Sequence, residues 1–96
     1  MNMITHDDGS QEWLENGLYH RLDGAALIWA DGTQEWYVNG HLHRLDGPAV
    51  IGADGIQQWW VDGRRITRQV TTWMKRRNVT WPWDQDAQVE FMLTWA

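Results

Sequence analysis

Residues 31–40, DGTQEWYVNG, set the pattern for most of the chain. Residues 8–17 read DGSQEWLENG and residues 54–63 read DGIQQWWVDG, so a related stretch recurs every 23 residues (8, 31, 54). A second part of the unit recurs as well, because HRLDGAALI at residues 20–28 matches HRLDGPAVI at residues 43–51. A fixed period of this length is typical of proteins built from stacked structural units. The sequence therefore predicts a repeat protein.

The glycines indicate what each unit is made of. Eight of the nine follow Asp or Asn, and Asx-Gly between short runs rich in Trp, Tyr, Val and Ile is the strongest local signal for a β-hairpin. We expect type I′ turns, which need a positive φ at both residues, and strands of about five or six residues. Alternation along these strands predicts one shared face for three residues, Trp13, Trp36 and Trp59.

One Asx-Gly site per unit is expected to be a corner and not a reversal. Three reversals per unit would make successive units run in opposite directions, so equivalent residues would lie in inequivalent places. Residues 45–48, LDGP, are the candidate corner in the middle unit, because Pro48 cannot donate to a central ladder. The return strand would then pair backwards through residues 41–44 and forwards through residues 49–51.

The repeat has a counterpart among known sequences. Residues 41–63, HLHRLDGPAVIGADGIQQWWVDG, resemble the HRxDGPA-type repeats of bacteriophage and large DNA virus proteins, which in turn resemble MORN-type hairpin repeats. The resemblance covers residues 3–63 and implies a hairpin-repeat fold and a viral origin. The chain departs from it at Ala25, which stands in place of proline, and at Ile66-Thr67, which replace His-Arg in the third unit.

The pattern changes after the third unit. Val70, Trp73 and Met74 have helical spacing after a candidate N-cap at Thr67, which predicts a helix over about 67–77. In residues 89–95 the large apolar residues Val89, Phe91, Leu93 and Trp95 alternate with Glu90, Met92 and Thr94. This spacing favours a capping strand, with a helix from Asp84 onward as the alternative. The predicted fold class is α+β, mainly β: an antiparallel meander of repeated hairpins, one helix and a capping strand. We expect a single domain of residues 1–96, with three repeats in 1–66 and the cap in 67–96.

Composition narrows the function classes. The 96 residues include nine Trp and no Cys, and the net charge is −5. Residues 1–63 hold ten acidic residues and two arginines (−8), residues 64–78 six basic residues (+6), and residues 79–96 three acidic residues (−3). No apolar run approaches the ~20 residues of a membrane span, and the start does not resemble a signal peptide. We therefore expect a soluble cytoplasmic protein, in the host cytoplasm if it is viral, with no membrane partner.

Chemistry could reside in the repeated HRLD segments. His20, Asp23, His43 and Asp46 would be acceptable zinc ligands or an acid and base for a metal-dependent hydrolase. The competing interpretation is structural, with Arg21 paired to Asp23 and Arg44 to Asp46. Ser10 is the only serine, and no nucleophile or phosphate-loop motif occurs. We expect no enzyme activity and no cofactor.

Recognition remains as the expected role. An acidic sheet bearing exposed aromatics suits a non-catalytic protein-binding module, and Trp29, unlike its repeat equivalents His6 and Gly52, is a candidate hot spot. With the resemblance, this predicts a phage accessory protein that antagonises a host factor or a nucleic-acid-handling defence complex, as an anti-CRISPR protein does. An open sheet edge would also permit a homodimer. The predicted protein-binding residues are Glu12, Trp29, Glu35, Tyr37 and Trp60. The alternative, nucleic-acid binding by the basic segment 64–77, would use Arg64, Arg65, Arg68, Lys75, Arg76 and Arg77.

Overall fold

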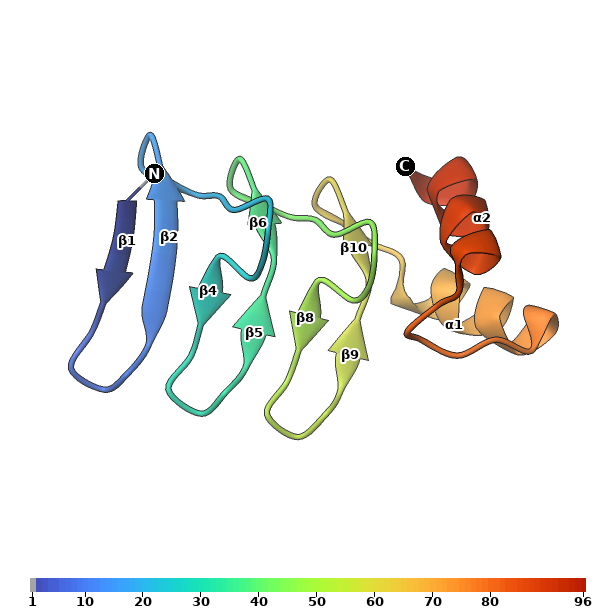
Figure 1. The fold of residues 1–96 in the computed structure, drawn as a ribbon, viewed down its shortest axis with the longest axis horizontal. Helices are drawn as coiled ribbons and strands as arrows, with labels where there is room; N and C mark the ends of the chain where they lie inside the picture. The colour runs from blue at the N-terminus through green and yellow to red at the C-terminus, as the bar shows by residue number, and fades with distance from the viewer. Residues whose placement is uncertain (1) are drawn as a thin grey trace.

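The structure, a computed structural model, describes residues 2–96 and is β-rich with two helices at one end (Figure 1). The predicted α+β class is confirmed. The strands are β1 (Asn2–Thr5), β2 (Gln11–Glu15), β3 (Leu18–Tyr19), β4 (Leu27–Ile28), β5 (Gln34–Glu35), β6 (Tyr37–Val38), β7 (His41–Leu42), β8 (Val50–Ile51), β9 (Gln57–Gln58), β10 (Trp60–Val61) and β11 (Arg64–Arg65). The helices are α1 (Thr67–Arg77) and α2 (Gln85–Trp95).

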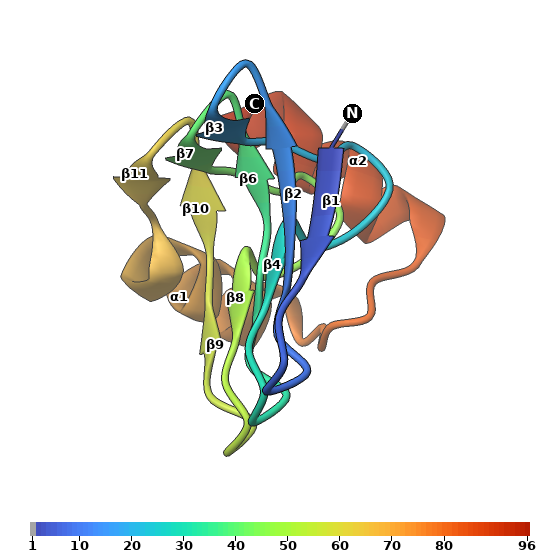
Figure 2. The same cartoon turned by 90° about the vertical axis from the view of Figure 1, so that its left-hand side faces the viewer.

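Three hairpins stand side by side along the length of the molecule, and every described strand pair is antiparallel (Figure 1). The largest sheet has the order β1-β2-β4-β5-β8-β9, with β3 also paired to β2. The pairs β6-β7 and β10-β11 form two further small sheets. Figure 2 shows them at the opposite end of the hairpins from the lower turns, which are the Asp-Gly turns at residues 8–9, 31–32 and 54–55. A single continuous ribbon was expected; the structure divides it into three sheets.

The division has a local cause at the tryptophans. The Trp36 N–H donates to the Ala49 carbonyl at 2.7 Å, whereas the Trp36 carbonyl accepts from the His43 N–H at 3.0 Å. The strand therefore changes its hydrogen-bonding partner at this residue, which is why most strands are shorter than predicted. Trp13 makes the same two contacts 23 residues earlier, to Ala26 at 2.7 Å and from His20 at 3.0 Å. There β2 remains continuous, because Trp13 also pairs with Met3 of β1.

The Asx-Gly sites fall into three conformational kinds. At the tips of β2-β3, β6-β7 and β10-β11 both turn residues have positive φ, for example 51° at Asn39 and 81° at Gly40, as a type I′ turn requires. In the lower turns only the glycine has positive φ, and the preceding aspartate accepts a backbone N–H two residues on. The expectation of type I′ turns throughout was wrong there, because the Asx turn supplies a different reversal.

The third kind is the corner. Neither Gly24 nor Gly47 is among the residues with positive φ. β7 is antiparallel to β6, and β8 is antiparallel to β5, while β5 and β6 follow one another in the same direction through Trp36 (Figure 1). β7 and β8 therefore run the same way, as expected for a corner at residues 45–48.

Two corrections concern the C-terminal part. Helix α1 has the predicted bounds, but its N-cap is Ile66, and the Thr67 hydroxyl instead accepts the Trp59 N–H at 3.0 Å. The predicted strand at residues 89–95 is wrong: the segment is helix α2, whose N-cap Asp84 accepts the Ala87 N–H at 2.8 Å. The cap therefore has two helices, and they cover the end of the hairpin array opposite β1 (Figure 1).

The larger core lies where the helices meet the last hairpin. Its buried members are Trp59, Val61, Ile66, Val70, Trp73, Ala87 and Phe91. Trp83 stacks on Trp59 with ring centroids 6.4 Å apart, and Trp73 meets Trp83 edge-on at 5.3 Å. Within residues 2–96, neither helix is long and apolar enough to cross a membrane.

Candidate functional site

One sheet face carries a chain of linked aromatic and carboxylate side chains. Alternation along β2 and β5 places Glu12 and Glu35 on the opposite face from Trp13 and Trp36. The Tyr19 and Tyr37 rings, 5.1 Å apart, lie between the two carboxylates, because each hydroxyl donates to one of them. We call Glu12, Tyr19, Trp29, Glu35 and Tyr37 the aromatic–carboxylate face.

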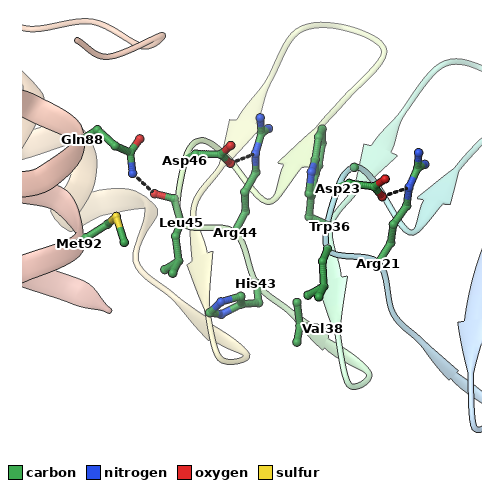
Figure 3. A pocket seen from close by; sticks show the side chains of 12 residues that line it. Arg21, Asp23, Trp36, Val38, His43, Arg44, Leu45, Asp46, Gln88 and Met92 are labelled. Carbon is green, nitrogen blue, oxygen red and sulfur yellow. Dashed lines mark hydrogen bonds and ion pairs between the residues drawn. The ribbon is translucent and has the colours of Figure 1, made fainter. Parts of the chain in front are cut away.

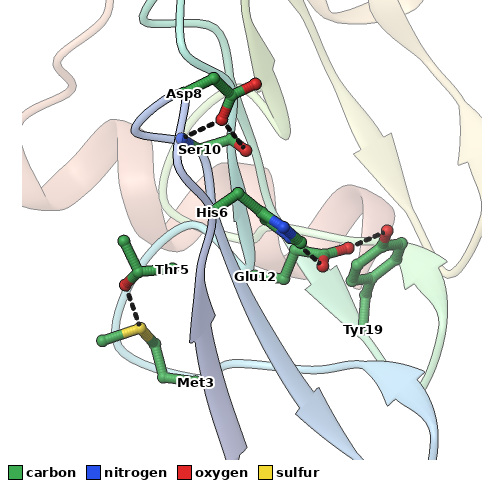
Figure 4. Close-up of polar contacts among 7 residues, drawn as sticks. All are labelled: Met3, Thr5, His6, Asp8, Ser10, Glu12 and Tyr19. Atoms are coloured by element: carbon green, nitrogen blue, oxygen red, sulfur yellow. Dashed lines mark hydrogen bonds and ion pairs between the residues drawn. The ribbon is translucent and has the colours of Figure 1, made fainter.

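Glu12 is held from two sides, as Figure 4 shows. The Tyr19 hydroxyl donates to Glu12 Oε1 at 2.6 Å, and His6 Nε2 lies 2.7 Å from Glu12 Oε2. The hydrogen bond from Tyr19, followed by the one from His6, lowers the pKa of the Glu12 carboxyl. The same bond raises the pKa of the Tyr19 phenol. Both effects keep Glu12 ionised and Tyr19 protonated, so this end of the face is acidic.

Glu35 repeats the arrangement in the next unit. The Tyr37 hydroxyl donates to its Oε1 at 2.8 Å, and the Trp29 indole N–H donates to its Oε2. Trp29 occupies the position of His6 one unit later, and each donates to the carboxylate six residues on. Burial, and then the bond to Glu35, raises the pKa of the Tyr37 phenol. Trp29 remains 49 % exposed, so a large ring is fixed in place at the surface.

Four of the five predicted protein-binding residues therefore share this face. The fifth, Trp60, has the repeat position of Tyr37, but its indole N–H donates to Gln58 at 3.0 Å, because the third unit has glutamine where the others have glutamate. Sequence reasoning missed Tyr19. The usable signal was the turn at Asn16-Gly17, which places Tyr19 across the hairpin from Leu14. The Tyr19 carbonyl accepts the Gly40 N–H of the next unit at 2.8 Å.

The other face carries two arginine–tryptophan pairs. Arg44 stacks over Trp36 at 3.9 Å, and its Nε donates to Asp46 at 2.8 Å. Arg21 stacks over Trp13 at 4.0 Å and donates to Asp23 at 2.9 Å. These contacts agree with the structural interpretation of the HRLD segments.

An open groove of about 660 Å³ runs between the two pairs and α2 (Figure 3). Leu22 and Leu45 line it from the two corners, and Gln88 and Met92 line it from the helix. Most of its lining surface is apolar, and its charged lining residues are the Arg21–Asp23 and Arg44–Asp46 pairs.

Comparison of the chain with protein-family models, with curated proteins and with solved structures gives no match.

The histidines of the HRLD segments hold turns together. His20 Nδ1 accepts the Asn39 N–H at 3.0 Å, and His43 Nδ1 accepts the Asp62 N–H at 3.0 Å. Each bond ties one unit to the hairpin tip of the next. No group of three or more His, Asp or Glu side chains in residues 2–96 is placed to hold a metal ion. With these imidazoles and the Asp23 and Asp46 carboxylates engaged in the fold, we do not propose a metal-dependent activity.

The predicted nucleic-acid residues spread over β11 and α1. Arg77 pairs with Glu90 at 3.0 Å, and it is the only one of the six with a carboxylate within ion-pair distance among residues 2–96. Arg68 and Arg76 lie beside Trp73 and Trp95 around a shallow hollow of about 450 Å³. Lys75 lines a different hollow, next to Met74 and Trp81. The positive charge is therefore available, but it does not form one stripe.

Proposed function

We propose that this chain is a non-catalytic protein-binding module, a phage accessory protein that antagonises a host factor or defence system. The carrying observation is Trp29, half exposed and held by Glu35 beside Tyr37. A large aromatic side chain that is already fixed loses little conformational entropy on binding, and such residues dominate interface energetics. The antagonist role, with anti-CRISPR inhibition as one form of it, is supported by the resemblance to phage repeat proteins.

The proposal includes the organisation of the scaffold. Residues 1–66 would act as three MORN-like hairpin repeats, and residues 67–96 as the cap that ends the array. The recurrence of the Trp13 contacts at Trp36 supports this organisation. So does the third unit, where the Thr67 hydroxyl accepts the Trp59 N–H in place of the carbonyl that Ala26 and Ala49 supply in the first two units. A rigid array would present the aromatic–carboxylate face in a fixed geometry.

A comparison of matched variants tests the proposal. Immobilised protein should retain a specific host protein, and Trp29→Ala should weaken the reconstituted complex with that purified protein by at least about tenfold, as expected for a hot-spot residue. Leu18→Ala is the control, because Leu18 has the same 49 % exposure at a hairpin tip. Equal affinity of the wild type and Trp29→Ala, or no specific host protein at all, would contradict the proposal.

Nucleic-acid binding is the second candidate, favoured by the five basic residues that have no carboxylate within ion-pair distance in the described part of the chain. It predicts binding to single-stranded DNA or RNA that weakens steeply with salt, since each phosphate contact releases counterions. The triple variant Arg68→Glu, Arg76→Glu and Arg64→Glu should abolish this binding, whereas reversal of Arg77, which already pairs with Glu90, should change it less. Absence of binding at low salt in a fluorescence-anisotropy titration would exclude this candidate.

A further inference from the structure

The groove contains two copies of one local structure. Residues 20–24 and 43–47 have the same sequence, HRLDG. In both copies the arginine stacks on its own tryptophan and donates to the aspartate two residues on. It also donates to the carbonyl four residues on, at 3.1 Å for Arg21 and 3.0 Å for Arg44. A side chain that fits one copy should therefore fit the other.

The C-terminal segment of the chain occupies the second copy. The Trp81 indole N–H donates to the Asp46 carbonyl at 2.9 Å, and its ring lies 5.3 Å from the Arg44 guanidinium carbon. Gly47 is buried beneath the indole: a Cβ there would lie 2.7 Å from Trp81 Nε1. Gln88 of α2 donates to the Leu45 carbonyl at 2.6 Å. An indole and a helix together cover this corner.

The first copy has no such cover. Leu22, the equivalent of the half-buried Leu45, is 78 % exposed. The three atoms nearest to a Cβ on Gly24 would all belong to the Arg21 side chain, whereas those nearest to a Cβ on Gly47 include two atoms of the Trp81 indole. No donor within residues 2–96 reaches the carbonyls of Leu22 and Asp23. The same groove passes over both corners, as Figure 3 shows.

We infer that the vacant corner formed by Arg21, Leu22, Asp23 and Gly24 is a docking site for a tryptophan-bearing segment of a partner protein. The indole would stack on the guanidinium and on Gly24, its N–H would donate to the Asp23 carbonyl, and an adjoining apolar side chain would cover Leu22. Tryptophan suits this corner because it combines a flat face with a donor at the ring edge. The chain's own Trp81 is engaged at the other corner and does not cover this one.

This site lies on the face opposite the aromatic–carboxylate face and goes beyond the surface proposed above. Strand alternation separates the two, since Trp36 and Val38 line the groove and Glu35 and Tyr37 lie on the other side. The corner can be tested with a peptide and without a host partner, so the two proposals can fail separately.

The probe is a synthetic peptide with the sequence of residues 79–92, added to full-length ¹⁵N-labelled protein. We expect saturable NMR shifts at the Gly24 amide and the Arg21 Nε–H. A peptide carrying Trp81→Ala should bind at least about tenfold more weakly, because the indole supplies both the stacking and the hydrogen bond. The Leu22→Asp protein should lose the peptide to a similar degree.

Two controls keep the result specific. Ile56→Asp places the same charge at another exposed apolar residue and should leave peptide affinity unchanged. Leu22→Ser removes the same apolar side chain without adding charge, and it should also weaken binding of the peptide. Equal binding by Leu22→Asp and wild type would overturn the inference. Shifts confined to residues 43–47 would also overturn it, since they would mean that the peptide only displaces the chain's own segment.

Discussion

Replacing Phe91 with alanine is expected to lower the free energy of unfolding by about 3–5 kcal/mol. Phe91 is fully buried at the centre of the cap. Its ring centroid lies 4.7 Å from Trp83, 5.0 Å from Trp95 and 6.2 Å from Trp73. Truncation would remove contacts with all three rings and leave a cavity that large, rigid indoles cannot readily fill.

Urea titration followed by circular dichroism and tryptophan fluorescence measures this effect. Leu93→Ala is the matched control, because Leu93 lies two residues away on the same helix and is 83 % exposed. That variant should change the free energy of unfolding by less than about 0.5 kcal/mol. If the two variants were equally stable, α2 would not pack on α1 and the last hairpin as described.

Helix α2 also shows where pattern reading failed. Val89, Phe91, Leu93 and Trp95 alternate with more polar residues, as in a strand, yet only Phe91 of the four is fully buried. The buried pair is Ala87 and Phe91, four residues apart, and the exposed Val89 and Leu93 obscured this helical spacing. The usable signal was Asp84, whose side chain caps the helix at the Ala87 N–H.

Local sequence predicted the parts of the site that depend on near neighbours. The Arg21–Asp23 and Arg44–Asp46 pairs join residues two apart, and the Asx-Gly tips need only the turn residues themselves. Trp81 on the Asp46 carbonyl joins residues 35 apart in the chain, and no periodic pattern announces such a contact. The vacant corner at Leu22 was therefore invisible in the sequence, where both HRLDG segments look alike.

The second large effect concerns these arginines. Arg44→Ala should lower the free energy of unfolding by about 2–4 kcal/mol, because it removes a charge-assisted bond to Asp46, a bond to the Pro48 carbonyl and a cation between two indoles. Arg21→Ala removes the equivalent bonds but only one indole contact, with Trp13. We expect Arg21→Ala to lower the free energy of unfolding by about half as much as Arg44→Ala. Arg44→Lys should recover only part of the stability, since an ammonium lacks the planar fork of donors.

A double-mutant cycle assigns the difference to the C-terminal segment. Trp81→Ala removes the second indole from Arg44 and the donor from the Asp46 carbonyl. In that background, Arg44→Ala and Arg21→Ala should cost nearly the same in urea titrations, because each arginine would then contact one indole and make the same two side-chain bonds. If Arg44→Ala still lowered the free energy of unfolding more than Arg21→Ala did, Trp81 would not provide the extra stability. That result would also count against an indole as the side chain that binds at the corner formed by Leu22.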